Sequence, residues 1–196
     1  MKLRGINFSP IFDASGVEGF FGEGYWYHKF LHLAGFSLKA CTFVSKTTTL
    51  NQRAGNMPLN KDGITPKEFF PRCIKVKLFG GFVLNSVGLS GPGAITLFED
   101  GRWQKRQKPF FLSFMSIGKT PEERINELKD YVNLFANYLS KFKTPVGLQI
   151  NYSCPNVGLK TKELIDEIKD GLQIASMLSI PLMPKLNITV SVEIAK

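Results

Sequence analysis

The chain has 196 residues, 43% of them hydrophobic and 21% charged, which is enough for one sizeable core and indicates a single domain. No apolar run approaches the ~18 residues that a membrane span needs, and the N-terminus lacks the features of a signal peptide, so we expect no membrane partner. Three scattered cysteines favour the reducing cytoplasm over a disulfide framework, and a net charge of +9 from dispersed basic residues is typical of a solvated surface rather than of a nucleic-acid partner.

Three apolar runs of strand length come first in the chain. They are residues 40–45 (ACTFVS), 82–87 (FVLNSV) and 110–117 (FFLSFMSI). We expect each of them to form a strand of one parallel sheet.

An amphipathic helix is predicted after these strands. Thr120 is a suitable N-cap, Pro121 suits the first helical position, and Glu123 completes a capping box. Apolar residues then recur every three or four positions, as on one face of a helix, at Ile125, Leu128, Val132, Phe135, Leu139 and Phe142.

The rest of the chain repeats this order of strand and helix. Residues 146–150 (VGLQI) predict another buried strand, and residues 180–186 predict a further one. Between them, apolar residues again have helical spacing, at Leu164, Ile165, Ile168, Leu172, Ala175 and Leu178. Strands that alternate with helices are typical of parallel βαβ units, so we expect an α/β fold.

The expected architecture is a TIM-type (β/α)8 barrel. About five strands are predicted here, whereas a complete barrel has eight strands and typically about 250 residues. The sequence therefore indicates a barrel truncated after about five strands, and we expect a single partial domain over residues 1–196.

Polar residues follow the predicted strands, on the side where barrels and other α/β sheets place their sites. The groups are Ala14–Gly16, Ser45–Thr49, Asn85–Leu89 and Asn151–Asn156, and Lys185 lies near the end of the last strand. Taken singly, each group also fits a structural role, as a helix cap, a turn or, for Cys154, a small buried apolar residue.

The most informative motif is Asn-Tyr-Ser-Cys-Pro-Asn at residues 151–156. It places the thiol of Cys154 between two carboxamides, directly after a buried strand. Carboxamides both donate and accept hydrogen bonds, as recognition of a flat heterocycle requires. A thiol has an ordinary pKa of about 8.5 and can be tuned towards the working pH, so Cys154 is a candidate base.

These motifs resemble, in the same order, those of the dihydroorotate dehydrogenases. NYSCPN is similar to the family's N-x-S-C-P-N loop, and NSVGL (85–89) is similar to its substrate-binding stretch. The other segments that resemble the family are ASGV (14–17), SKTTTL (45–50), RAGN (53–56), PR (71–72), and PKL (184–186) followed by EIA (193–195). A cysteine at the position of the base resembles the soluble class.

The resemblance implies an FMN enzyme that oxidises dihydroorotate to orotate in pyrimidine synthesis. Cys154 would remove the C5 proton while a hydride passes from C6 to FMN, and Lys46 would lie between flavin and substrate. The implied substrate contacts are Lys46, Asn85, Ser86, Val87, Gly88, Leu89, Asn151 and Asn156, and the implied flavin contacts are Ala14, Ser15, Lys46, Thr47, Asn151 and Lys185. The resemblance leaves the electron acceptor open and permits a homodimer.

The sequence also departs from the family. The loop between RAGN and NSVGL is longer than usual, and Pro184 interrupts a strand in which it cannot donate a ladder hydrogen bond. One alternative is a tRNA-dihydrouridine synthase, another flavin barrel, although its cysteine loop usually reads Gly-Cys-Pro. A second alternative is a non-catalytic chain that binds FMN weakly because it lacks the loops that grip the phosphate.

Overall fold

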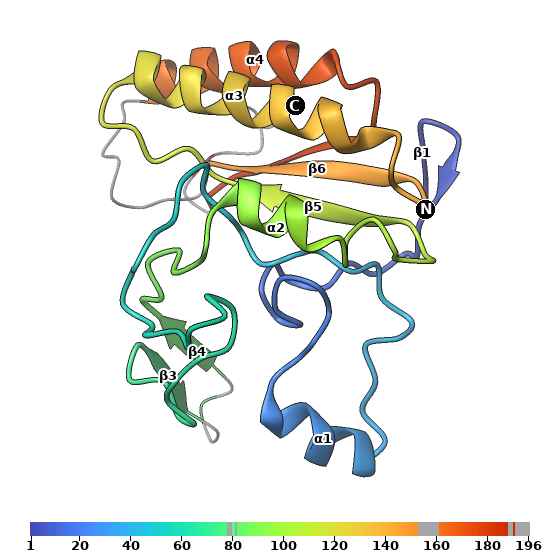
Figure 1. The fold of residues 1–196 in the computed structure, drawn as a ribbon, viewed down its shortest axis with the longest axis vertical. Helices are drawn as coiled ribbons and strands as arrows, with labels where there is room; N and C mark the ends of the chain where they lie inside the picture. The colour runs from blue at the N-terminus through green and yellow to red at the C-terminus, as the bar shows by residue number, and fades with distance from the viewer. Residues whose placement is uncertain (78–79, 81, 153–160, 188–189, 191–196) are drawn as a thin grey trace.

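A computed structural model describes residues 1–77, 80, 82–152, 161–187 and 190 (Figure 1). The elements are β1 (Lys2–Leu3), β2 (Ile6–Asn7), α1 (Trp26–Leu33), β3 (Ile74–Lys77), β4 (Phe82–Asn85), α2 (Ala94–Asp100), β5 (Phe110–Phe114), α3 (Pro121–Leu139), β6 (Val146–Asn151), α4 (Thr161–Ser176) and β7 (Leu182–Lys185). In this part of the chain, none of the helices combines the length and apolarity that crossing a membrane requires.

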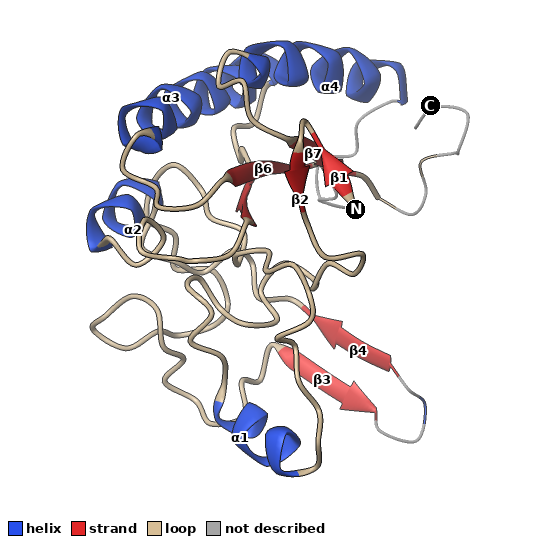
Figure 2. Cartoon of the chain, turned by 90° about the vertical axis from the view of Figure 1, so that its right-hand side faces the viewer, coloured by secondary structure: helices blue, strands red, loops and turns tan. Residues whose placement is uncertain are grey.

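A parallel sheet of three strands, in the order β5-β6-β7, forms the centre of the molecule. Helices α3 and α4 lie side by side over it, at the opposite end of the molecule from α1 and the β3–β4 hairpin (Figures 1 and 2). Alternate residues of β5 enter the two apolar cores, as strand geometry requires. Phe114 stacks on Tyr131 of α3, with ring centroids 4.0 Å apart, whereas Phe111 packs with Phe8 on the other face of the sheet.

Two further segments extend this sheet in parallel. Thr42 pairs with Phe12, and Val44 and Thr48 pair with Phe111 and Phe114 of β5. Four residue steps separate Val44 from Thr48, but three separate their partners, so the 42–48 segment contains one extra residue. We call residues 45–47 the bulge, because an extra residue in one of two paired strands is the defining feature of a β-bulge.

The predicted strand at 40–45 is therefore an extended parallel segment that the bulge interrupts. The predicted strands at 110–117, 146–150 and 180–186 are confirmed as β5, β6 and β7. Across the described residues the parallel segments do not close into a barrel.

The run at residues 82–87 forms the predicted strand, β4, but its predicted place in the parallel sheet was wrong. This run does not join the parallel sheet but pairs antiparallel with β3, from Ile74 opposite Asn85 to Lys77 opposite Phe82, and all of β4 is exposed. The reason is local: β3 is a second strand-forming run nearby, and the intervening sequence contains Gly80 and Gly81, which are typical of hairpin turns. A nearby partner also costs less loop-closure entropy than a distant one.

The predicted helices are confirmed. Thr120 caps α3, because its side chain accepts a hydrogen bond from the backbone N–H of Glu123, and Pro121 occupies the first turn. A buried ion pair joins α3 to α4: the guanidinium of Arg124 donates to both carboxylate oxygens of Glu167, at 2.8 and 2.6 Å.

Pro184 lies within β7 without costing a hydrogen bond to β6. The backbone N–H groups of Leu148 and Tyr152 donate to the carbonyls of Pro181 and Lys185, so the odd-numbered residues of β7 face β6. Successive backbone groups of a strand point to opposite sides, and the nitrogen of Pro184 therefore faces the outer edge.

Candidate functional site

The carboxyl ends of the parallel segments gather most of the predicted flavin-contacting residues. Ala14 and Ser15 follow the segment that pairs with Thr42, and Lys46 and Thr47 lie in the bulge. Asn151 and Lys185 end β6 and β7 and are paired across the sheet. Because the carboxyl ends of parallel strands meet at one edge, these residues share that edge.

A line of side-chain contacts joins this edge to the interior of the sheet. The Thr47 hydroxyl lies 2.8 Å from that of Ser15 and 2.9 Å from that of Ser113, and the Asn151 carboxamide donates to it over 3.4 Å. Ser113 in turn lies 2.9 Å from the carboxamide of Gln149. The sequence prediction missed Ser113 and Gln149, although a polar residue inside an apolar run, in FFLSF and in VGLQI, was a signal that could have found them.

Lys46 is the most unusual charge of this edge. The residue is 8% exposed, and its ammonium group has no hydrogen-bond partner among the described residues. The nitrogen lies 4.8 Å from the ring centroid of Phe20. Burial lowers the pKa of Lys46 from 10.5 to about 8, against the opposing effect of Glu23 and Cys73. A buried cation without a protein partner is suited to a negatively charged or electron-rich ligand.

The segment after Pro10 passes closely over Lys46. Gly16 has a positive φ of 92°, and a Cβ there would lie 3.5 Å from Cγ of Lys46. The Ser15 hydroxyl donates to the carbonyl of Ser45 at 2.8 Å. The 14–17 segment and the bulge are therefore held together by direct contacts.

The predicted substrate-binding stretch, residues 85–89, forms a second group. The Asn56 side chain donates to the carbonyl of Ser86 at 2.7 Å, its backbone N–H donates to Val87 at 2.9 Å, and the Arg53 guanidinium donates to the carbonyl of Gly88 at 2.8 Å. The RAGN and NSVGL motifs thus lie against each other.

Gly88 and Leu89 in this stretch both have positive φ, 68° and 60°. Asn85 is exposed at the end of β4. Ser86 is anchored to Cys73, whose carbonyl accepts its backbone N–H at 2.8 Å, and Cys73 acts on the charge of Lys46. The stretch therefore borders the first group through Cys73.

Cys154 and Asn156 lie outside the described residues. The nearest described residues are Asn151 and Tyr152, which follow directly from β6. The other two cysteines, Cys41 and Cys73, are free thiols that are half buried.

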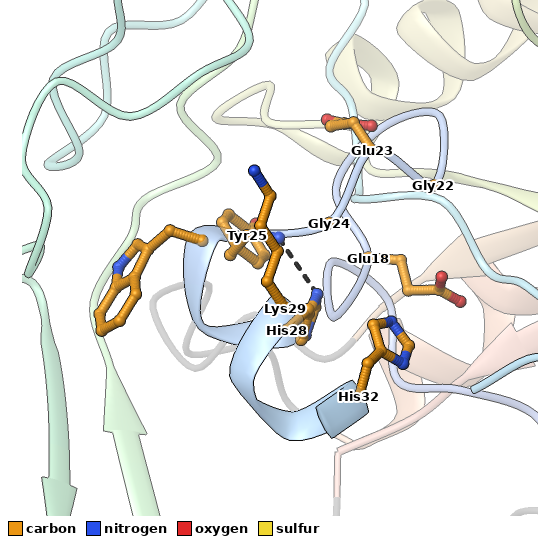
Figure 3. Close-up of a pocket in the computed structure, with 9 residues that line it drawn as sticks. Glu18, Gly22, Glu23, Gly24, Tyr25, His28, Lys29 and His32 are labelled. Carbon is orange, nitrogen blue, oxygen red and sulfur yellow. Dashed lines mark hydrogen bonds between the residues drawn. The ribbon is translucent and has the colours of Figure 1, made fainter. Parts of the chain in front are cut away.

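A pocket of about 350 Å³ lies elsewhere, beside α1 (Figure 3). Glu18, His28, Lys29 and His32 are among the residues that line it, and the backbone N–H of Tyr25 donates to Nδ1 of His28. None of the predicted site residues lines it. Within the part of the chain that the structure describes, no three His, Cys, Asp or Glu side chains are grouped as metal ligands.

Comparison with known proteins identifies the family. The sequence profile of the family described as dihydroorotate dehydrogenase matches residues 1–191. The chain belongs to the dihydroorotate dehydrogenase family. The match includes the motifs at both groups of the candidate site, and it does not favour the alternative of a tRNA-dihydrouridine synthase.

Relatives of two kinds are similar to this dihydroorotate dehydrogenase family member. The catalytic subunit of dihydroorotate dehydrogenase B (NAD(+)) from Desulforudis audaxviator is 33% identical over 151 residues, which cover 76% of this chain and 39% of that protein. Dihydroorotate dehydrogenase A (fumarate) from Lactobacillus delbrueckii is 30% identical over 205 residues, which cover 100% of this chain and 57% of that protein. The chain thus spans about half the length of these relatives.

Proposed function

We propose that the protein oxidises dihydroorotate to orotate in pyrimidine synthesis, with FMN as the hydride acceptor. The family match over residues 1–191 and the names of the relatives support this reaction. The observation that carries the proposal at this site is the buried ammonium of Lys46, which lies without a protein partner among the described residues, at the edge where the other predicted contacts meet.

The residues at this edge fit FMN. Lys46 offers a positive charge, and Lys185, whose pKa is lowered by partial burial, offers a second. Hydroxyls and a carboxamide provide donors and acceptors for a flat heterocycle. FMN, when bound, supplies the acceptor for the hydride that leaves C6 of dihydroorotate. The proposed contacts to FMN are Ala14, Ser15, Lys46, Thr47, Asn151 and Lys185.

The chain supplies the base and the substrate contacts. The thiolate of Cys154 takes the proton from C5, and Asn85, Asn151 and Asn156 hydrogen-bond the pyrimidine and its carboxylate, with the backbone of residues 86–89. The chain is proposed to be a single FMN-binding unit of the barrel that its family implies. The electron acceptor stays open, because relatives named for NAD(+) and for fumarate match with similar identity.

The test is reduction of the flavin by dihydroorotate in the complete, FMN-loaded protein. Cys154→Ala should retain the flavin absorbance but slow its bleaching roughly 100- to 10,000-fold, which is the usual contribution of a general base. Cys154→Ser should lose activity at neutral pH and regain part of it at high pH, because a hydroxyl is harder to deprotonate than a thiol.

Cys41→Ala and Cys73→Ala are the matched controls and should react nearly as fast as the wild type. Rapid mixing followed by absorbance distinguishes the cases. If Cys154→Ala bleached at the wild-type rate, the assignment of the base would be wrong.

A further inference from the structure

Every polar group of Ser113 contacts either the bulge or Thr48, the residue that directly follows it. Its backbone N–H donates to Oγ of Ser45 at 2.9 Å, and its carbonyl accepts the N–H of Thr48 at 2.9 Å. Its hydroxyl lies 2.9 Å from that of Thr47. Ser113 itself is completely buried. One serine of β5 therefore holds the bulge at both flanks, on either side of Lys46.

Gln149 of β6 holds the hydroxyl of Ser113 in turn. Their contact of 2.9 Å begins a line that continues through Thr47 to Ser15 and ends at the carbonyl of Ser45, with the last two contacts at 2.8 Å. Gln149 is 6% exposed. The line crosses the parallel segments from β6 to the 14–17 segment.

A count of protons gives this line a direction. The hydroxyls of Ser15, Thr47 and Ser113 supply three protons for four contacts, and the carbonyl of Ser45 only accepts. With Oε1 of Gln149 facing Ser113, one contact would therefore lack a proton. Turning the carboxamide by half a rotation places Nε2 there, and every contact then has a donor, running from Gln149 towards Ser45.

We infer that Ser113, held by Gln149, is a positioning residue that keeps the bulge turned so that Lys46 and Thr47 face the candidate site. The inference rests on the proposed function for its catalytic meaning, since Lys46 is a proposed contact of flavin and substrate. The physical basis is that a bulge leaves one residue unpaired in the ladder, so its side chains take their direction from contacts such as these. Neither Ser113 nor Gln149 touches the reacting atoms in this proposal.

The test measures the midpoint of the Lys46 titration by NMR in protein labelled with ¹³C-lysine. The Lys46→Arg variant assigns the signal, because it removes that resonance alone. The midpoint in the wild type is expected at about 8, because burial lowers the pKa of Lys46 and the neighbouring Glu23 and Cys73 oppose this effect only in part. Ser113→Ala should release the bulge and move the midpoint upward by about one pH unit, because a less buried ammonium holds its proton more tightly. Gln149→Met should move it in the same direction by less.

Two control variants separate the loss of the Ser113 hydroxyl from the effects of substitution in general. Ser113→Thr retains the hydroxyl and should retain the wild-type midpoint, whereas Ser176→Ala removes an exposed hydroxyl that contacts only Gln173 and should change nothing. An unchanged midpoint in both Ser113→Ala and Gln149→Met would overturn the inference, and so would a Ser113→Thr variant that behaves like the alanine. The titration needs neither flavin nor dihydroorotate, so it can succeed where the Cys154 test fails.

Discussion

At the scale of the residue, Asp13 is a carboxylate that the fold buries next to the candidate site. It is 8% exposed, and one of its oxygens accepts the backbone N–H of Val44. Burial, followed by the neighbouring Glu18 carboxyl, raises the pKa of Asp13 from 3.8 to about 7. Because Asp13 directly precedes Ala14 and Ser15, its charge acts on the segment that is proposed to contact FMN.

Replacing Asp13 with asparagine should change how stability depends on pH. The folded-state pKa lies above the unfolded value, so the folded protein binds the extra proton between about pH 4 and 7 and its free energy of unfolding falls as the pH rises through that range. Asp13→Asn should remove this fall and be more stable than the wild type at pH 8 by on the order of 2–4 kcal/mol. Urea denaturation between pH 4 and 8 measures it, with exposed Asp130→Asn as the control. Identical pH profiles for wild type and Asp13→Asn would contradict the assignment.

Some residues of the candidate site could be predicted from the sequence and others could not. The motifs identify Lys46, Thr47 and Asn151 by type and order, because a resemblance is carried by local sequence. Ser113 and Gln149 lie in runs whose composition predicts only burial. Their contact depends on the register between β5 and β6, in which Ser113 pairs with Gln149, and register between strands distant in the chain is set by tertiary packing.

At the scale of the element, Gly171 of α4 leaves space for the side chain of Tyr152, which lies two residues before Cys154. A Cβ at Gly171 would collide with the hydroxyl oxygen of Tyr152 and would come within 3.1 Å of Cδ2 of Leu128, whereas the ring carbon Cζ of Tyr152 would lie at 3.4 Å, which is ordinary contact. A glycine inside a helix usually costs about 1 kcal/mol relative to alanine. Helix α4 therefore gives up intrinsic stability at the point where it covers Tyr152.

Gly171→Ala should accordingly destabilise the protein, by about 1–3 kcal/mol, because overpacking outweighs the better helix propensity. In the background of Tyr152→Phe the same change should be less destabilising by about 1 kcal/mol or more, since the colliding oxygen is gone and only the close approach to Leu128 is left. Urea denaturation of the two single variants and the double variant measures the coupling. Equal effects of Gly171→Ala in both backgrounds would show that the hydroxyl is not what the glycine accommodates.

Elements also differ in how far their sequence predicts them. The helix α3 and the strands β5 and β6 bury residues with a regular period or in a continuous run, and that pattern is enough. The run at 82–87 has a similar composition to these strands, but its partner is β3, which the prediction did not include. The bulge could not be predicted from the sequence either, because one extra residue in a paired strand does not alter the apolar composition of the 42–48 segment.

At the scale of the whole molecule, burial is concentrated in the parallel sheet and its helices. All residues of β5 and β6 are buried, whereas all of β4 and all but the first residue of β3 are exposed. The hairpin also forms a sheet of its own. Its opening exposes little apolar surface and leaves the parallel sheet intact.

Amide hydrogen exchange should reveal this division. The backbone amides of β3 and β4 are expected to exchange on the order of 100-fold faster than those of β5 and β6, because they need only local opening. Exchange followed by NMR under native conditions gives the rates residue by residue. Equal protection in the hairpin and in β5 would mean that the two unfold together.

Pro184 limits how a further strand can pair with β7. In the described part of the chain, β7 is the outermost strand of the parallel sheet, and the nitrogen of Pro184 faces outward from it. An open strand edge is a template on which another chain can add a strand and begin aggregation. A proline at that edge offers an incoming strand no N–H and places a ring in its path. A strand that paired with β7 on this side would therefore receive no hydrogen bond from Pro184 and would have to accommodate its ring.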